Sequence, residues 1–76
     1  MDSFDRQLVS FVLTWAPFGG ADDEDTFPRF GLRAGAVWQR FERILDAVAA
    51  GQLRVRDGDA ELIRRAGELR PAHPSA

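Results

Sequence analysis

The side chains of this 76-residue chain that could do chemistry are almost all arginines and carboxylates. The chain contains no Cys, Lys or Tyr, and its one histidine, His73, lies near the C-terminus between two prolines. Without cysteine there is no disulfide, no thiolate nucleophile and no sulfur-ligated zinc site, and without lysine there is no Schiff base. We therefore expect a small binding protein that has no enzymatic activity, no cofactor and no metal.

Two groups of carboxylates are the remaining candidates for a metal site. In the run Asp22-Asp23-Glu24-Asp25 the acids are consecutive, so their side chains diverge, and no calcium-loop spacing follows. The dipole of a helix favours acids at its N-terminus, which explains this run without a metal. The segment Asp57-Gly58-Asp59 is likewise typical of a turn followed by a helix cap.

Apolar residues recur at spacings of three and four over most of the chain, which is typical of amphipathic helices. The pattern predicts four helical segments: Phe4 to Ala16, a short segment that ends at Gly31, Ala34 to Ala50, and Ala60 to Arg70. We therefore predict an all-α fold, a small four-helix domain. A chain of this length supports one hydrophobic core, so residues 1–70 should form a single domain and residues 71–76 a flexible C-terminal tail.

The predicted helix ends depend on capping residues and helix breakers. Asp2 or Ser3 can cap the first helix, and Gly51 can end the third in a left-handed conformation. Asp59 can cap the fourth helix, which Pro71 should stop.

The segment between the third and fourth helices, Gln52 to Arg56, alternates like a β-strand. A lone strand has nothing to pair with in a helical domain. We therefore interpret the segment as an extended linker that places Leu53 and Val55 on the core.

Pro28 constrains where the second helix begins, because a proline is tolerated in the first turn of a helix but not in its interior. A cap at Asp25 or Thr26 would place Pro28 in the first turn, whereas an earlier start at Asp22 would require a kink. The helix is short in either case, and both of its phenylalanines should face inward: Phe27 and Phe30.

A glycine turn joins the second and third helices. Gly31 can take the positive φ of a sharp turn at low steric cost, and Leu32 can fill the angle between the two helices. This arrangement is typical of a helix-turn-helix, although any small helical bundle can contain a glycine turn followed by an apolar residue. The pattern alone leaves a helix-turn-helix and a generic helical corner both open.

One stretch resembles a family of short actinobacterial proteins of unknown function: Phe30-Gly31-Leu32-Arg33-Ala34-Gly35-Ala36-Val37-Trp38-Gln39-Arg40-Phe41, followed by Ile44-Leu45-Asp46. Members of that family have a Phe-Gly-Leu turn, two aromatics, a Gln and a Leu-rich helix that ends in Asp. They close with an Arg-rich helix, which Asp59 to Arg70 resembles. The resemblance covers about Phe4 to Arg70, and it implies a helix-turn-helix reminiscent of sigma-factor DNA-binding regions. This sequence differs at Val37-Trp38, where the family has paired aromatics, and at Gly35, where a polar residue is usual.

The helix-turn-helix and the distribution of charge predict DNA binding in transcriptional regulation. The net charge is −2, but residues 1–32 hold six acids and two arginines, whereas residues 33–76 hold eight arginines and six acids. Arginine suits bidentate contacts to guanine or phosphate, although an ordinary solvated helix face would also explain these arginines. We predict that six residues of the third and fourth helices contact DNA: Arg33, Gln39, Arg40, Arg43, Arg64 and Arg65.

The alternative function is a protein-interaction module derived from a helix-turn-helix, with no DNA binding. The acidic first half and the basic second half could dock a charged partner or a second copy of the chain, which would give a homodimer. The chain has many aromatic residues for so small a core, and an exposed one could anchor an interface. Trp38 is the candidate anchor, because it lies one position off the apolar stripe of the third helix.

The uncharged stretch from Gln7 to Ala21 is the one candidate for a membrane segment. It is shorter than the roughly 20 residues that a spanning helix needs, and no basic region precedes it as in a secretory signal. We therefore expect no membrane association. The lack of cysteine agrees with a cytoplasmic location.

Overall fold

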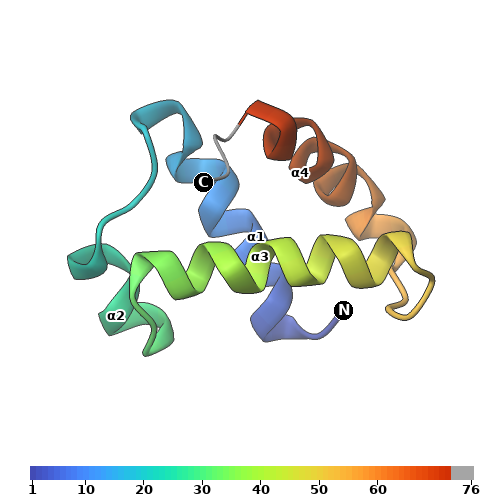
Figure 1. Cartoon of the computed structure of the whole chain (residues 1–76). Helices are drawn as coiled ribbons and strands as arrows, with labels where there is room; N and C mark the ends of the chain where they lie inside the picture. Colours follow the sequence, from blue (N-terminus) through green and yellow to red (C-terminus); the bar gives the residue numbers. More distant parts are fainter. Residues whose placement is uncertain (73–76) are drawn as a thin grey trace.

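The computed structural model describes the backbone of residues 1–72 and the side chains of residues 1–69. This part of the chain contains four α-helices, two short 3₁₀ helices and no β-strand (Figure 1): α1 (Ser3–Trp15), η1 (Ala16–Phe18), α2 (Asp23–Phe30), α3 (Ala34–Ala49), η2 (Asp57–Asp59) and α4 (Ala60–Ala72). The prediction of an all-α, four-helix fold is confirmed. Residues 71 and 72 of the predicted tail belong to α4, and residues 73–76 lie outside the described residues.

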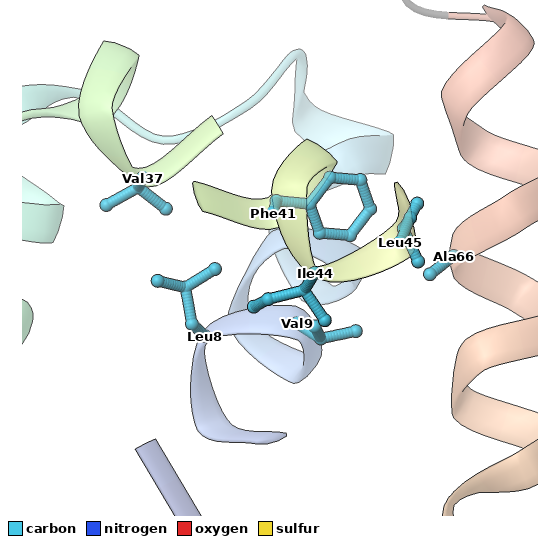
Figure 2. Close-up of a cluster of buried hydrophobic side chains, with 7 residues drawn as sticks. All are labelled: Leu8, Val9, Val37, Phe41, Ile44, Leu45 and Ala66. Atoms are coloured by element: carbon cyan, nitrogen blue, oxygen red, sulfur yellow. The ribbon is translucent and has the colours of Figure 1, made fainter. Parts of the chain in front are cut away.

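The core forms where α1 crosses α3, and α4 packs against both of these helices (Figure 1). Figure 2 shows the buried cluster, in which side chains from three helices meet: Leu8 and Val9 of α1, Val37, Phe41, Ile44 and Leu45 of α3, and Ala66 of α4. Leu45 lies toward α4 and is buried, whereas Val48, also on α3, is only partly buried. Burial of each large apolar side chain contributes about 1.5–3 kcal/mol, so this cluster is the main source of stability.

Three predicted helix ends are confirmed. The Asp2 carboxylate accepts a hydrogen bond from the backbone N–H of Asp5 at 2.8 Å and caps α1. Gly31 ends α2 with a φ of +70°, and its N–H donates to the carbonyl of Phe27 at 2.8 Å. Gly51 follows α3 with a φ of +73°. Glycine enters this left-handed region readily, which explains why both helices end there.

The second helix begins earlier than Pro28 led us to expect. Its first residue is Asp23, after the cap residue Asp22, and Pro28 is its sixth residue. The predicted caps Asp25 and Thr26 are therefore wrong. The early start is stabilised by a capping box, in which the backbone N–H of Asp22 donates to the Asp25 carboxylate at 3.1 Å. Satisfying these N-terminal amides offsets the one backbone hydrogen bond that Pro28 cannot make.

The buried line of α2 runs through Thr26 and Phe30. Thr26 is 1% exposed, and its hydroxyl donates to the carbonyl of Asp23 at 3.5 Å, so its buried polar group has a hydrogen-bond partner. Phe30 packs against the core, whereas Phe27 is 58% exposed, so the expectation that Phe27 faces inward is wrong. Residues four apart share a helix face, and Phe27 is turned about 100° from Thr26.

Asp59 immediately precedes α4, at the position predicted for its cap residue, whereas Pro71 does not stop the helix as predicted. Asp59 is the last residue of η2 and is buried, and its carboxylate accepts a hydrogen bond from Nε of Arg6 at 3.2 Å. This ion pair ties the start of α4 to α1. The helix continues past Pro71 to Ala72, because the fixed φ of proline is helical and its insertion loses only one hydrogen bond in the last turn.

The linker between α3 and η2 has no regular secondary structure, as predicted. Leu53 packs against the core and Val55 is partly buried. The N-terminal ammonium of Met1 donates to the carbonyl of Arg54 at 2.5 Å, which holds the linker beside the start of α1. No helix in the described part of the chain is long and apolar enough to cross a membrane.

The interior position of Pro28 gives a direct test of how α2 begins. Pro28→Ala should raise the free energy of unfolding by about 1 kcal/mol or more, because alanine restores the missing amide and removes the clash of the ring with the preceding turn. Pro17→Ala is the matched control: Pro17 lies in the first turn of η1, so its replacement should change stability by less than about 1 kcal/mol. Urea denaturation measures both. Equal effects of the two substitutions would contradict an interior proline.

Candidate functional site

The outward face of α3 presents three of the six residues that we predicted to contact DNA. Val37 and Phe41 face the core, which turns Gln39 and Arg43 toward solvent on the opposite side of the helix. Arg33 is the N-cap residue of α3 and is exposed. These three side chains form no ion pair with any residue that the structure describes. They are therefore available to a ligand.

Arg40 is exposed, but it forms an ion pair with a residue of another helix. Its Nη2 lies 3.1 Å from Oδ1 of Asp5, and its guanidinium group lies 4.9 Å from the ring centroid of Phe4. The Arg40 side chain is 46% exposed, and the carboxylate that it pairs with belongs to α1. Arg40 thus joins α3 to α1, and its charge is already neutralised.

Arg64 and Arg65 of α4 have different surroundings. Nε and Nη2 of Arg64 donate to the two carboxylate oxygens of Glu61, at 2.9 and 2.5 Å, and its Nη1 donates to Glu68. The hydrogen bonding of Arg64 to Glu61 lowers the pKa of the exposed Glu61 carboxyl. The carboxylates of Glu61 and Glu68 together raise the pKa of Arg64. Arg65 is exposed and forms no ion pair within the described residues.

An acidic residue occupies the N-terminus of α3, where a DNA-binding helix would approach phosphate. Oδ1 of Asp23 accepts a hydrogen bond from the backbone N–H of Ala34 at 2.8 Å. The first residue of α2 therefore caps the first turn of α3. The segment that contains α2, the glycine turn and α3, residues 22–49, holds six acids and four arginines, so its formal net charge is −2. This net charge opposes contact of the segment with a phosphate backbone.

An apolar groove of about 550 Å³ lies between the end of α1, the connection from η1 to α2, and the first turns of α3. In Figure 1 the connection from η1 runs down to α2, which lies beside the start of α3. Its wall is largely aromatic and aliphatic: Phe11, Val12, Trp15, Val37, Trp38 and Leu69. Small residues at the ends of the helices leave the space open: Ala16, Gly19, Gly20, Ala21, Ala34 and Gly35. Thr26, Gln39 and Glu42 are its polar residues.

Trp38, the predicted interface anchor, packs partly against the core. Its ring centroid lies 4.8 Å from that of Phe41, and the side chain is partly buried. The remaining surface of Trp38 lines the groove together with Trp15. The groove therefore contains both tryptophans of the chain.

A row of five aromatic rings runs along α1 and joins it to α2 and η1. The row is made by successive ring contacts at 5.8, 5.1, 6.0 and 6.1 Å between Phe4, Phe30, Phe11, Trp15 and Phe18. Its last ring, Phe18, is 76% exposed. The guanidinium group of Arg29 lies over two rings in the middle of the row, at 5.4 Å from Phe11 and 5.8 Å from Phe30. These contacts fix α2 on α1 and shape one wall of the groove.

The structure thus divides the predicted site residues between two places. Arg33, Gln39 and Arg43 lie on α3, whereas Arg64 and Arg65 lie on α4, which Figure 1 shows beside the other half of α3. Sequence reasoning missed the groove, because its wall combines residues from four helices. The one local signal was the concentration of glycine and alanine between the first and third predicted helices and at the start of the third. No group of three or more acidic or histidine residues in the described part of the chain could hold a metal ion.

Comparison of the chain with known protein families, with characterised proteins and with solved structures found no match. The resemblance to the actinobacterial family and the function that it implies therefore stay predictions. The geometry of the chain itself is the basis of the function proposed below.

The contacts of Arg40 with Asp5 and Phe4 predict that this side chain contributes to the stability of the fold. Arg40→Ala should lower the free energy of unfolding by about 0.5–1 kcal/mol, because it removes both the ion pair with Asp5 and the contact with Phe4. Arg43→Ala, one turn later on the exposed face, should change it by less than about 0.5 kcal/mol. Chemical denaturation measures both variants. If Asp5→Asn costs as much in the Arg40→Ala background as in the wild type, the two side chains are not coupled.

Proposed function

We propose that this chain is a protein-interaction domain that uses a helix-turn-helix scaffold to hold a groove for apolar side chains of a partner protein. The observation that carries the proposal is the open, aromatic-lined groove of about 550 Å³ between α1 and α3. Sites that bind small molecules or side chains are concave, mostly apolar and largely preformed, with volumes of roughly 300–1,000 Å³. The groove fits that description.

The lining residues can supply the energy of association. Trp15 and Trp38 are partly buried in the free protein, so each keeps an apolar surface that a partner would cover. Tryptophan is enriched among the residues that dominate interface energies. A partner that inserts one large apolar side chain gains about 1.5–3 kcal/mol from its burial, so several such contacts are needed to exceed the cost of association.

The charges of the helix-turn-helix favour this role over DNA binding. Arg40 and Arg64 are paired with carboxylates of the same chain, and Asp23 caps the N-terminus of α3. Binding to duplex DNA draws most of its affinity from neutralised phosphates, which requires a net basic face. The net charge of −2 over residues 22–49 opposes it.

DNA binding in transcriptional regulation is the second candidate function, and a specific observation favours it. Arg33, Gln39 and Arg43 are exposed on the outward face of the helix that follows the glycine turn, where a recognition helix presents its base-reading residues. Gln39 can pair with adenine, and the two arginines can contact guanine or phosphate.

Binding of a partner in the groove can be tested with peptides selected from a displayed random library on the wild-type protein. Gly35→Gln should weaken binding of the selected peptides on the order of tenfold or more, about 1.4 kcal/mol, because the new side chain enters the groove. Space around Gly35 is open, so the variant should fold normally. Gly67→Gln is the matched control, since Gly67 is equally open, lies in a helix and does not line the groove. Fluorescence of Trp15 and Trp38 reports the binding.

A mobility-shift assay with random-sequence duplex DNA separates the two candidate functions. We expect no shift at low salt, because the net negative charge of residues 22–49 opposes binding to phosphate. A shift that weakens steeply with salt and is reduced by Arg33→Ala and Arg43→Ala would contradict this expectation and support the second candidate. These two substitutions should leave the fold intact, because both side chains are exposed and unpaired within the described residues.

A further inference from the structure

We propose that residues 19–31 form a hinged flap along one side of the groove, and that α2 moves away from α3 as a unit to admit a partner. The inference rests on the proposed function and adds how access to the groove is controlled. It follows from the way in which the flap is joined to the rest of the molecule.

The flap supplies one wall of the groove but no residue of the buried core. Gly19, Gly20, Ala21 and Thr26 line the groove, so displacement of the flap would widen it. The buried cluster is made by α1, α3 and α4, and none of the eight residues of α2, all of which the structure describes, belongs to it. Figure 1 shows α2 beside the start of α3, whereas the linker to α4 leaves the other end of that helix. The flap can therefore move without breaking the crossing of α1 and α3.

Glycines in left-handed conformations stand at both ends of the flap. The φ angles of Gly19 and Gly20 are +84° and +97°, and that of Gly31 is +70°. Beyond the neighbouring residues, no atom lies within 4 Å of the position that a Cβ would take at any of the three. Glycine adopts positive and negative φ about equally, and hinges are a few residues at the ends of elements that absorb such changes. The backbone can thus rotate at both ends of α2 with little steric resistance.

Between these glycines, α2 is held by few buried side chains. Thr26 is its one buried residue, whereas α1 buries three residues and α3 buries four. Pro28 removes one backbone hydrogen bond from the interior of this short helix. Segments that bury little apolar surface open locally at a lower free energy than the core. We therefore expect α2 to open before the other helices.

The contacts that close the flap differ between the two ends of α2. Arg29 and Phe30, next to the hinge at Gly31, contact aromatic rings of α1 and would move least. At the other end, the carboxylate of Asp23 accepts a hydrogen bond from the backbone N–H of Ala34 at 2.8 Å. Ala34 also lines the groove, so this bond fastens the flap to α3 at the groove. Because the bond is exposed to water, its loss should raise the population of the open form without unfolding the chain.

Native-state hydrogen exchange of the full-length chain measures the opening directly. The backbone amides of Phe27, Arg29 and Phe30 report on α2, and those of Phe41 and Leu45 report on the core of α3. If α2 opens as a unit, its three amides should share one protection factor within about threefold, and it should lie on the order of a hundredfold below that of the α3 amides.

Ile44→Val separates opening of the flap from unfolding of the whole chain. The substitution removes one methylene from the buried cluster where α1 crosses α3. Because this crossing stays formed when the flap opens, the protection of the α3 amides should fall about three- to tenfold, and that of the α2 amides should not change.

Asp23→Ala removes the hydrogen bond to Ala34 and tests whether opening controls binding. It should lower the protection of the α2 amides about tenfold. It should also raise the affinity for groove-dependent peptides by the same factor, because apparent affinity is proportional to the population of the competent form. These are the peptides selected on the wild-type chain whose binding Gly35→Gln weakens.

Glu24→Ala is the matched control for Asp23→Ala. It also removes an acid from the first turn of α2, but Glu24 is exposed and forms no ion pair with any described residue. We expect it to change protection and peptide affinity by less than about threefold. Asp23→Asn keeps an acceptor oxygen and should restore most of the wild-type protection.

Three results would overturn the flap and leave the proposed function standing. The first is an equal loss of protection in α2 and α3 on Ile44→Val, which would show that α2 opens only with the whole chain. The second is protection that changes steadily from Phe27 to Phe30, which would indicate fraying of a helix end. The third is a peptide affinity that is unchanged or lower in Asp23→Ala. Absence of any groove-dependent peptide would instead overturn the proposed function together with the control of access to the groove.

Discussion

The crossing of α1 over α3 is the contact on which the rest of the molecule depends. Leu8 and Val9 meet Phe41 there, and all three side chains are fully buried (Figure 2). The small side chain of Ala66 lets α4 approach this crossing closely. Two ion pairs between helices of the described residues, Arg6 with Asp59 and Arg40 with Asp5, use a residue of α1. In a domain of this size, which buries a modest share of its surface, such a shared central helix concentrates the stabilising contacts.

Features of the fold that depend on neighbours in sequence could be predicted, whereas those that depend on distant residues could not. The Asp2 cap and the turns at Gly31 and Gly51 need only residues within one helical turn, and the structure confirms them. The burial of Thr26 depends on how α2 lies on α1 and α3. Hydrophobicity alone therefore predicted, wrongly, that Phe27 would be buried.

The candidate site shows the same division. Exposure of Gln39 and Arg43 follows from the apolar spacing of α3, and it could be predicted. The partner of Arg40 is a carboxylate 35 positions earlier in the chain, and nothing near Arg40 in sequence indicates it. The groove is assembled from residues of four helices, so only its small residues left a trace in the sequence. An arginine that a sequence pattern predicts to contact a ligand can therefore already be paired with residues of its own chain.

Gly35 links the fold to the groove. A glycine inside a helix costs up to about 1 kcal/mol relative to alanine, and nothing lies within 4 Å of the position that a Cβ would take. Its backbone is helical, since positive φ in the described part of the chain is confined to other glycines. Neither packing nor backbone conformation thus requires a glycine at this position. Gly35 lines the groove together with Trp15 and Trp38, and it adds no side chain that would fill the space beside them.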